Sequence, residues 1–447
     1  MDERIEHLFC DVVIVGCGVA GLYCALNLPR ELSIIMLAKT TLDECDSMLA
    51  QGGICVQHDA NDYAPFFEDT LRAGHFENRR ESVDLMIRAS RSVIDNLMNF
   101  GVDFARNDDG TLRYTREGAH SRARICYHQD TTGAEITMKL LAAVKQLANV
   151  RILENTCMDD ILTEEIISTR SSRGVRQVSR PKNARERCRG IVAHSDDGRA
   201  ISIAANATVW ACGGIGGMYK RSTNFPCLTG DALRIAQTYG IALEHTDYVQ
   251  IHPTSLYTSK PGRAFLISES CRGEGAVLLD ARGRRFTDEL QPRDVVSAAI
   301  EQQMAKEGSD YVRLSFANVP KNEIIGHFNH IYEHCLAEGY DITREPIPVV
   351  PAQHYFMGGV HVDRQSATTM PSLYAVGETS CNGVHGKNRL ASNSLLESLV
   401  FAQRAAWDIA RKESLRSPYL QTYSEHPIGA EAKAYEEFCM TKEAVCA

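Results

Sequence analysis

The sequence lacks several features that would mark a membrane, secreted or metal-binding protein. It has no run of eighteen consecutive apolar residues, so we expect no transmembrane helix. Its first eleven residues are acidic and lead directly into a β-branched run, unlike a secretory signal peptide. None of its 15 cysteines forms a C-x-x-C pair or shows metal-ligand spacing. We therefore expect small buried thiols, no metal, no membrane contact and a reducing, cytoplasmic location.

Excess basic charge is also missing. The chain carries 48 Lys and Arg against 57 Asp and Glu, a net charge of −9, which disfavours a general nucleic-acid partner. Residues 170–189 are an exception, because they hold seven arginines and Lys182 with few apolar anchors. A solvated hairpin or loop explains this stretch better than an anion-binding patch. No internal repeat or low-complexity tract is present.

The stretch around which the sequence is organised is residues 11–26, DVVIVGCGVAGLYCAL. Val12–Val15 predicts a buried strand, and a helical pattern follows the glycines. Gly16, Gly18 and Gly21 form G-x-G-x-x-G between the two elements. The first glycine suits a tight turn, the second lets backbone approach a pyrophosphate, and the third allows close helix–strand packing. Because a diphosphate binds well at a helix N-terminus, the stretch predicts a dinucleotide site.

The rest of the chain continues this α/β pattern and suits two or three domains. We expect further strands at 32–37, 150–153, 204–211 and 373–376, and helices at 69–100, 231–240 and 395–412. The last helix is expected to open with a capping box of Ser394 and Glu397. The alternation of strands and helices loosens between about 241 and 350, which suggests an inserted domain. The final thirty residues resemble a helical tail.

The residues after the second strand bear on the identity of the dinucleotide. A Rossmann site usually places an acid there to bind the ribose hydroxyls. This chain has Ala38 followed by Lys39 instead. The pattern therefore favours a dinucleotide other than a freely exchanging NAD.

Polar side chains gather beside glycines in the second half of the sequence. His252, His354, Arg293 and Arg389 lie in such clusters, together with the hydroxyl of Ser268. Taken singly, each histidine reads as structural and each arginine as a surface charge. Taken together, they suit a dicarboxylate, because arginine binds a carboxylate through two parallel hydrogen bonds and histidine adds donors.

A combination of motifs gives the chain a resemblance to a known family. The motifs are GCGVAGL, AQGGI, TREGAHS, IHPTSLY, SESCRGEGA, PRDVV, AQHYFMGGV, and VGE followed by HGKNRLASNSLLE. The chain resembles the L-aspartate oxidases, in the flavoprotein superfamily shared with fumarate reductase and succinate dehydrogenase. The resemblance implies a Rossmann-like FAD-binding domain (1–240 and 351–415), an inserted α+β capping domain (241–350) and a short helical tail (416–447). From the resemblance we expect the C-terminal helical domain common in the family to be almost absent.

The resemblance also implies roles for the polar residues. Arg293 matches the arginine that acts as proton donor and acceptor. His252, His354, Ser268 and Arg389 match the residues that hold the two substrate carboxylates. Ser268 replaces the threonine usual in the family and keeps the hydroxyl. Glu117 matches the acid that pairs with the substrate ammonium.

The FAD site follows in the same way. In the membrane-bound relatives a histidine five residues before the acid or amide of A-[QE]-G-G carries the flavin. Asp46 stands at that position here, counted from Gln51, so we expect non-covalent FAD. The predicted cofactor contacts are Gly16, Cys17, Gly18, Val19, Ala20, Gly21, Lys39, Asp46, Ser47, Met48, Leu49, Ala50, Gln51, Gly52, Gly53, Asp231, Glu378, Ser394 and Leu395.

The activity implied by the resemblance is oxidation of L-aspartate to iminoaspartate, with the reduced flavin reoxidised by oxygen or fumarate. The family's place in de novo NAD biosynthesis further implies a quinolinate synthase partner. A soluble fumarate reductase is the nearest alternative, and it would not need Glu117. A flavin-binding sensor or scaffold would not need the two histidines and two arginines. A nucleic-acid-modifying flavoprotein would use residues 170–189, against the acidic total charge.

Overall fold

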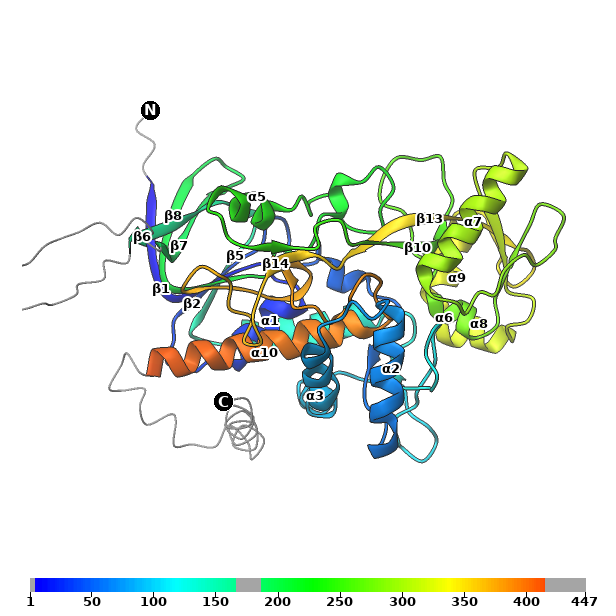
Figure 1. Cartoon of the computed structure of the whole chain (residues 1–447), viewed down its shortest axis with the longest axis horizontal. Helices are drawn as coiled ribbons and strands as arrows, with labels where there is room; N and C mark the ends of the chain where they lie inside the picture. The colour runs from blue at the N-terminus through cyan, green and yellow to red at the C-terminus, as the bar shows by residue number, and fades with distance from the viewer. Residues whose placement is uncertain (1–4, 166–185, 415–447) are drawn as a thin grey trace, which may run out of the picture.

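The computed structural model describes residues 5–165 and 186–414. Its largest element is a seven-stranded sheet whose central strands are parallel (Figure 1). In spatial order the strands are β5 (Val150–Leu153), β2 (Ile34–Leu37), β1 (Glu6–Val15), β8 (Ala200–Trp210), β7 (Glu186–Ser195) and β6 (Thr156–Glu165), with β15 (Leu373–Ala375) beside the end of β8. Strand β7 runs antiparallel to both of its neighbours, β8 and the edge strand β6.

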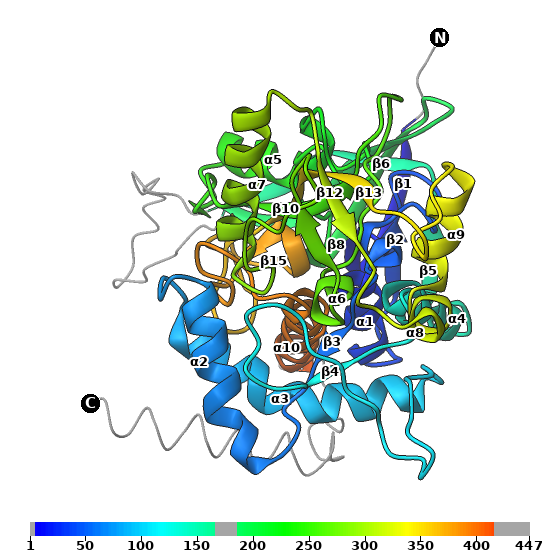
Figure 2. The same cartoon turned by 90° about the vertical axis from the view of Figure 1, so that its right-hand side faces the viewer.

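Helices cover one face of this sheet and form the largest core. They are α1 (Val19–Asn27), α2 (Tyr63–Ala73), α3 (Arg80–Asn99), α4 (Thr132–Lys145) and α10 (Asn393–Ser414). All residues of α1 except Asn27 are buried, because the helix lies between the sheet and both α4 and α10. A helix that is apolar all round is typical of such a central position. Figure 2 shows α10 end-on beneath the sheet, with α1 and α3 beside it.

Smaller elements complete the cofactor-binding half. Helix α5 (Asp231–Thr238) and strand β14 (Gly359–His361) contribute to a second core on the other face of the sheet. The remaining short elements are η1 (Asp46–Leu49), β3 (Ile54–Cys55), η2 (Ala60–Asp62), β4 (Ile125–Cys126), η3 (Gly216–Met218), β9 (Leu243–Glu244), η4 (Gly377–Thr379) and β16 (Ser380–Cys381). Strand β3 pairs with β4, and β14 pairs with both β9 and β16.

A four-stranded antiparallel sheet with its own core lies at the far end of the molecule, on the right in Figure 1. Its order is β10 (Val249–Leu256), β13 (Ile347–Phe356), β12 (Val312–Ser315) and β11 (Val277–Leu279). The helices of this region are α6 (Glu269–Gly273), α7 (Arg293–Glu307), α8 (Lys321–His327) and α9 (Asn329–Ala337). Strands β10 and β13 run from this sheet back toward the larger one, so the cofactor-binding half and this region meet along them (Figure 1).

These observations confirm the expected fold class, an α/β FAD-binding type with an α+β region inserted. The domain boundaries remain a prediction. The strands expected at 32–37, 204–211 and 373–376 correspond to β2, β8 and β15. Residues 170–185 of the basic stretch and the tail at 416–447 lie outside the described residues, and Glu186 opens β7.

Two local predictions were wrong. The helix expected over 69–100 is two helices, α2 and α3. Its chain turns between them because Gly74 ends α2, and His75 and Phe76 adopt left-handed backbone angles of φ 58° and 61°. The capping box at the start of α10 does not form. Ser394 Oγ accepts a hydrogen bond from Arg389, and Glu397 accepts one from Asn382 instead of a backbone amide.

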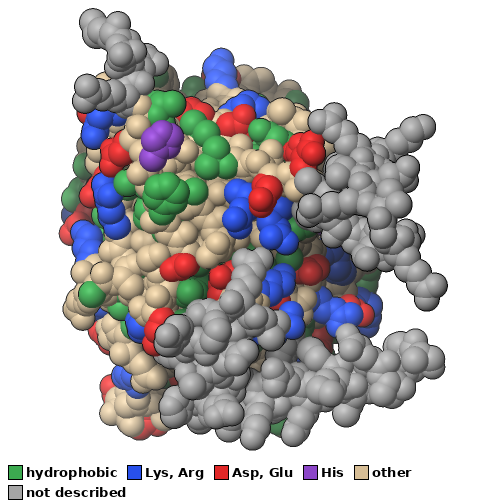
Figure 3. Space-filling view, turned by 90° about the vertical axis from the view of Figure 1, so that its left-hand side faces the viewer, with side chains coloured by type: hydrophobic (Ala, Val, Ile, Leu, Met, Phe, Trp, Pro, Cys, Tyr) green, Lys and Arg blue, Asp and Glu red, His purple; other side chains and the backbone are tan. Residues whose placement is uncertain are grey.

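The described part of the chain contains no helix that is both long and apolar enough to cross a membrane. The cysteines described are all free thiols. On the face shown in Figure 3, basic side chains lie beside acidic ones. Ion pairs in the described chain include those of Glu6 with both Arg151 and Arg199, and of Arg189 with Glu164.

Candidate active site

One cavity receives the predicted site residues from both halves of the molecule. It encloses about 1710 Å³ of empty space, part of which opens to solvent. Of the predicted cofactor contacts, Gly21 and Met48 do not line it. The predicted residues that do line it are Gly16, Cys17, Gly18, Val19, Ala20, Lys39, Asp46, Ser47, Leu49, Ala50, Gln51, Gly52, Gly53, Glu117, Asp231, His252, Ser268, Arg293, His354, Glu378, Arg389, Ser394 and Leu395.

The glycine turn at one end of the cavity has the geometry its spacing predicts. Gly16 has φ +115°, and a Cβ there would lie 2.0 Å from the carbonyl oxygen of Ala211. A Cβ on Gly21 would lie 2.0 Å from the carbonyl oxygen of Gly16, so α1 could not pack this closely on β1. Gly18 faces the cavity, where only the Ser47 hydroxyl comes near. The turn thus brings the N-terminus of α1 to the cavity wall, where the Val19 amide donates to Ser47 Oγ at 3.1 Å. A helix N-terminus in this position favours an anionic group.

Lys39, just after β2, occupies the position where an acid was missing from the sequence pattern. Its Nζ donates to Asp231 Oδ2 and to Thr229 Oγ1, each at 2.8 Å, and to the carbonyl of Cys227 at 2.9 Å. Asp231 begins α5, so the contact joins two distant segments at the cavity wall. These polar groups can bind the ribose end of a dinucleotide in place of the usual acid.

Two carboxyl groups lie between this end and the far end. Glu378 Oε1 accepts from the amide of Phe356, and Asp46 Oδ1 from the amide of Phe225, each at 2.9 Å. Burial raises the pKa of Glu378 to about 8 and that of Asp46 to about 7. Asp46 Oδ2 has no partner in the described chain although it is buried. An unpartnered buried carboxyl oxygen in a cavity wall is typical of a site that holds a polar ligand.

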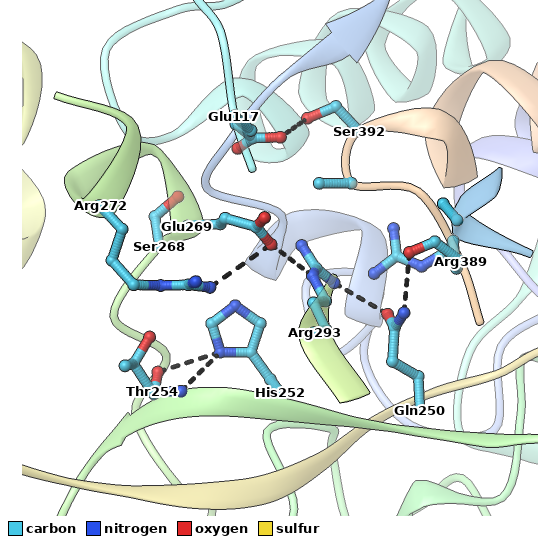
Figure 4. A network of polar contacts seen from close by, with 12 residues as sticks. Glu117, Gln250, His252, Thr254, Ser268, Glu269, Arg272, Arg293, Arg389 and Ser392 are labelled. Carbon is cyan, nitrogen blue, oxygen red and sulfur yellow. Dashed lines mark hydrogen bonds and ion pairs between the residues drawn. The ribbon is translucent and has the colours of Figure 1, made fainter. Parts of the chain in front are cut away.

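The far end of the cavity is charged and buried. Arg293, at the start of α7, donates from Nε to Glu269 Oε2 at 2.5 Å and from Nη1 to Gln250 Oε1 at 2.9 Å (Figure 4). Glu269 also faces Arg272 Nη2 at 3.5 Å, and all these side chains are almost fully buried. The side-chain amide of Gln250 donates from Nε2 to the backbone carbonyl of Arg389 at 2.8 Å. The contacts therefore fix the two arginine-bearing segments relative to each other.

His252 and His354 approach from the neighbouring strands β10 and β13. Their ring centroids lie 5.0 Å apart at an interplanar angle of 68°. His252 Nδ1 lies 3.2 Å from the backbone amide of Thr254 and 3.1 Å from its carbonyl oxygen, so it accepts in one tautomer and donates in the other. The His252 Nε2 is buried without a partner among the described residues. Burial and the nearby arginines hold the pKa of both histidines well below the ordinary value, so the rings are neutral.

Arg389 lies between this charged cluster and helix α10. Its Nη1 donates to Ser394 Oγ at 2.8 Å, and its guanidinium lies 4.3 Å from the ring centroid of Tyr355. Its Nε has no partner in the described chain. Burial lowers its pKa to about 10, which leaves it a cation at neutral pH. A buried cation with a free donor is suited to a carboxylate.

Glu117 comes from a loop of the cofactor-binding half and reaches the same end of the cavity. Its carboxylate is 3% exposed and accepts from Ser392 Oγ and Ser270 Oγ at 2.5 and 2.7 Å. Burial and the nearby Glu269 raise its pKa. The structure therefore brings together all six residues predicted for the reacting end.

The sequence reasoning missed several residues of this end. Gln250, Glu269, Arg272 and Ser392 stand in the polar clusters that it noted, but it gave them no role. Their signal is position, because each lies within four residues of a predicted site residue in the same motif. Only the fold shows that Glu269 contacts two arginines, Arg293, which lies 24 residues away along the chain, and Arg272, which lies three residues away.

The cavity fits FAD. The glycine turn brings the N-terminus of α1 to the cavity wall, and Lys39 and its partners offer polar groups farther along. Asp46 Oδ2 and Gln51 Oε1 are buried without partners in the described chain. Residues 11–395 match the family model described as FAD binding domain. Fold and site thus define an FAD-dependent oxidoreductase.

The curated relatives narrow this class. The chain is 46% identical over 400 residues to the L-aspartate oxidase of Clostridium perfringens, covering 89% of this chain and 86% of that protein. It is 38% identical to the L-aspartate oxidase of Neisseria meningitidis, covering 96% of this chain and 83% of that protein. The chain belongs to the L-aspartate oxidase family.

A solved structure supports the same superfamily. A mutant FrdA chain of E. coli quinol fumarate reductase superimposes with a TM-score of 0.79 at 27% identity. The match covers 98% of this chain and 74% of that one. The resemblance to fumarate reductase predicted from the motifs is confirmed at the level of the whole fold.

Proposed function

We propose that this protein oxidises L-aspartate to iminoaspartate with non-covalently bound FAD, as an enzyme of NAD biosynthesis. The observation that carries the proposal is the buried Glu117 carboxylate at the same end of the cavity as two arginines and two neutral histidines. This arrangement offers donors to two carboxylates and an acceptor to one ammonium group. L-aspartate has these three charges.

The cofactor role rests on the cradle. The amides at the start of α1 and the Lys39–Asp231 pair would hold FAD, and Asp46 cannot form the histidyl linkage of the membrane-bound relatives. Bound FAD would supply the redox chemistry, as acceptor of the hydride equivalent and donor of electrons to oxygen or fumarate. The residues of this chain bind and orient the substrate.

The two carboxylates of the substrate would be held by groups from different strands. Arg389 Nε and His252 Nε2 have no partner in the described chain, and both residues line the cavity together with His354 and Ser268. Holding both ends of a four-carbon substrate fixes its Cα–H in one direction. Such orientation can contribute on the order of 7 to 11 kcal/mol to lowering the barrier.

Arg293 would move the proton. Its Nε is hydrogen-bonded to Glu269, and Glu269 is in turn paired with Arg272. With fumarate as acceptor, the guanidinium would donate a proton to a fumarate carbon and recover one from solvent, to which part of the cavity opens. The two arginines lower the pKa of Glu269, so this carboxylate stays ionised and holds the guanidinium in place.

A soluble fumarate reductase is the second candidate, because the fold match is to a fumarate reductase. Glu117 argues against it as the main activity. A buried carboxylate repels a dicarboxylate unless a cation lies between them. The ammonium group of aspartate supplies that cation, whereas fumarate and succinate have none.

The proposal also includes the setting of the reaction. We place the enzyme in the cytoplasm, with L-aspartate as substrate and fumarate or oxygen as acceptor. An imine is prone to hydrolysis, which favours direct use of the product by a quinolinate synthase partner.

Anaerobic bleaching of the flavin band at ~450 nm tests this function. L-aspartate, succinate and D-aspartate are added separately to the purified yellow protein. We expect bleaching by L-aspartate and recovery of the band on addition of fumarate. Bleaching by succinate but not by L-aspartate would move the assignment to fumarate reductase. No bleaching by any of the three would contradict both assignments.

A further inference from the structure

The Glu117 carboxylate has an unusual environment for a buried charge. Its two hydrogen-bond partners are hydroxyls, those of Ser270 and Ser392. No Lys, Arg or His of the described chain lies within ion-pair distance of it, although Arg293 is close enough to lower its pKa slightly against the effect of burial. A carboxylate has about four acceptor positions, so two remain for a ligand. The carboxylate is thus oriented but not neutralised.

Ser270 belongs to a short chain of hydroxyls that ends on Glu117. The Ser268 hydroxyl donates to Ser270 Oγ at 3.2 Å, and the Ser270 hydroxyl donates to Glu117 Oε1 at 2.7 Å. The amide of Ser270 donates back to Ser268 Oγ, which caps α6 and fixes both residues. Ser268 lies in the cavity wall, whereas Ser270 lies behind it and is 1% exposed. Ser270 therefore acts on Glu117 and not directly on a ligand in the cavity.

Ser392 reaches Glu117 from the opposite side and holds a strained backbone to do so. Its φ is +60°, a left-handed value that non-glycine residues rarely adopt. Strain of this kind persists where the surrounding structure enforces it, and it concentrates at functional sites. Gly52 closes the remaining side, since a Cβ there would lie 2.3 Å from Glu117 Oε1. The carboxylate thus has one orientation available to it.

We propose that Ser270 and Ser392 are positioning residues that orient Glu117 and keep it in the carboxylate form. They thereby give the site its preference for a dicarboxylate with an ammonium group. This inference rests on the proposed function, in which Glu117 binds the ammonium. Both hydroxyls donate to the charged form of the acid and oppose the effect of burial, so their removal favours the protonated acid, which cannot bind a cation well.

The test compares two ligands on the holoenzyme variants Ser270→Ala and Ser392→Ala. The first ligand is L-aspartate, followed by steady-state turnover, and the second is succinate, followed by perturbation of the flavin spectrum. We expect KM for L-aspartate to rise about tenfold in each variant, because each loses one hydrogen bond to a charged group. Succinate has no ammonium, and its dissociation constant should stay within about twofold of wild type.

The pH profile separates this role from a structural one. Without one donor, the pKa of Glu117 rises further, so the acidic limb of kcat/KM for L-aspartate should move to higher pH. Raising the pH should then restore much of the lost affinity, and Ser270→Thr should restore it at neutral pH. Ser366→Ala is the matched control, since Ser366 is also buried at φ +61° but donates to the carbonyl of Phe401 instead.

The outcomes are distinct. Equal weakening of L-aspartate and succinate, or an unchanged KM for L-aspartate in both variants, would overturn the positioning role. A wild-type enzyme that L-aspartate does not reduce would instead overturn the proposed function. If Ser392→Ala does not fold, Ser392→Gly removes the hydroxyl while accommodating the left-handed backbone, and Ser270→Ala tests the inference alone.

Discussion

The two ends of the cavity differ in what forms their walls. At the glycine turn the wall is backbone, and its shape depends on missing side chains at Gly16 and Gly21. At the charged end the wall is buried side chains, and its shape depends on contacts among Arg293, Glu269 and Gln250. The glycine turn itself comes from one short stretch of sequence, although Gly16 packs on the carbonyl of the distant Ala211. The charged end is assembled from segments more than 200 residues apart.

This difference separates binding from chemistry. Backbone amides at a helix start bind a diphosphate of any nucleotide cofactor and do not discriminate among substrates. Buried side chains are expensive to desolvate and are retained where their charge is used. We therefore expect changes at the glycine turn to act on cofactor affinity and stability, and changes at the charged end to act on turnover.

The largest effect should follow from Arg293→Leu at the charged end. This change removes the proposed proton donor, so we expect kcat for L-aspartate to fall by roughly 10³-fold or more. The flavin should stay bound, because Arg293 contacts Glu269 and Gln250 and not the glycine turn. The flavin absorbance per protein, measured after gel filtration, checks retention of the cofactor. A variant that keeps most of its turnover would show that the guanidinium only binds charge.

How much of each end is predictable from sequence follows from the same contrast. The geometry of the glycine turn was predicted from spacing alone, because G-x-G-x-x-G between a strand and a helix specifies a local structure, whereas the other cofactor contacts came from the family resemblance and remain predictions. The roles of the residues at the reacting end were predicted from the family resemblance. The hydrogen bonds that hold those residues in place were not predicted and are known only from the structure. Nothing in the sequence spacing shows that Ser270 and Ser392, 122 residues apart, meet on one carboxylate. The turn at His75 and Phe76 was also missed, since neither residue type signals a left-handed backbone.

The second prediction addresses the glycine turn with the smallest possible side chain. Gly21→Ala places a Cβ 2.0 Å from the Gly16 carbonyl oxygen and 3.3 Å from Ile14 Cγ2. Because the nearest atom is backbone, α1 must shift, at a cost of about 1 to 3 kcal/mol in stability. We expect a lower melting temperature and weaker FAD binding, measured by unfolding and by flavin titration.

A matched glycine provides the control. Gly326 in α8 has no neighbouring atom within 4 Å of an added Cβ. Gly326→Ala should leave FAD binding unchanged and stabilise the helix slightly, by up to about 1 kcal/mol. Equal behaviour of the two variants would show that close packing of α1 on β1 is not required for the cofactor.

The last prediction concerns Glu378, a carboxyl in the cavity wall. Its folded pKa of about 8 lies above the ordinary value, so the folded state holds its proton more tightly than the unfolded state. Below about pH 4.5 the acid is protonated in both states and costs nothing. As the pH rises toward 8, ionisation favours the unfolded state, so the wild-type protein loses stability through this window.

Glu378→Gln keeps the polar contact to the Phe356 amide and removes the titration. The variant should therefore unfold at a higher temperature than wild type at pH 9 and at nearly the same temperature at pH 4.5. We expect the difference at pH 9 to reach roughly 1 to 3 kcal/mol, since the carboxyl faces a cavity that admits water. Thermal unfolding of both proteins at matched flavin content over this pH range measures it. If the difference does not grow with pH, the pKa of Glu378 is not raised in the folded protein. The cavity wall around this carboxyl would then be as well solvated as the unfolded chain.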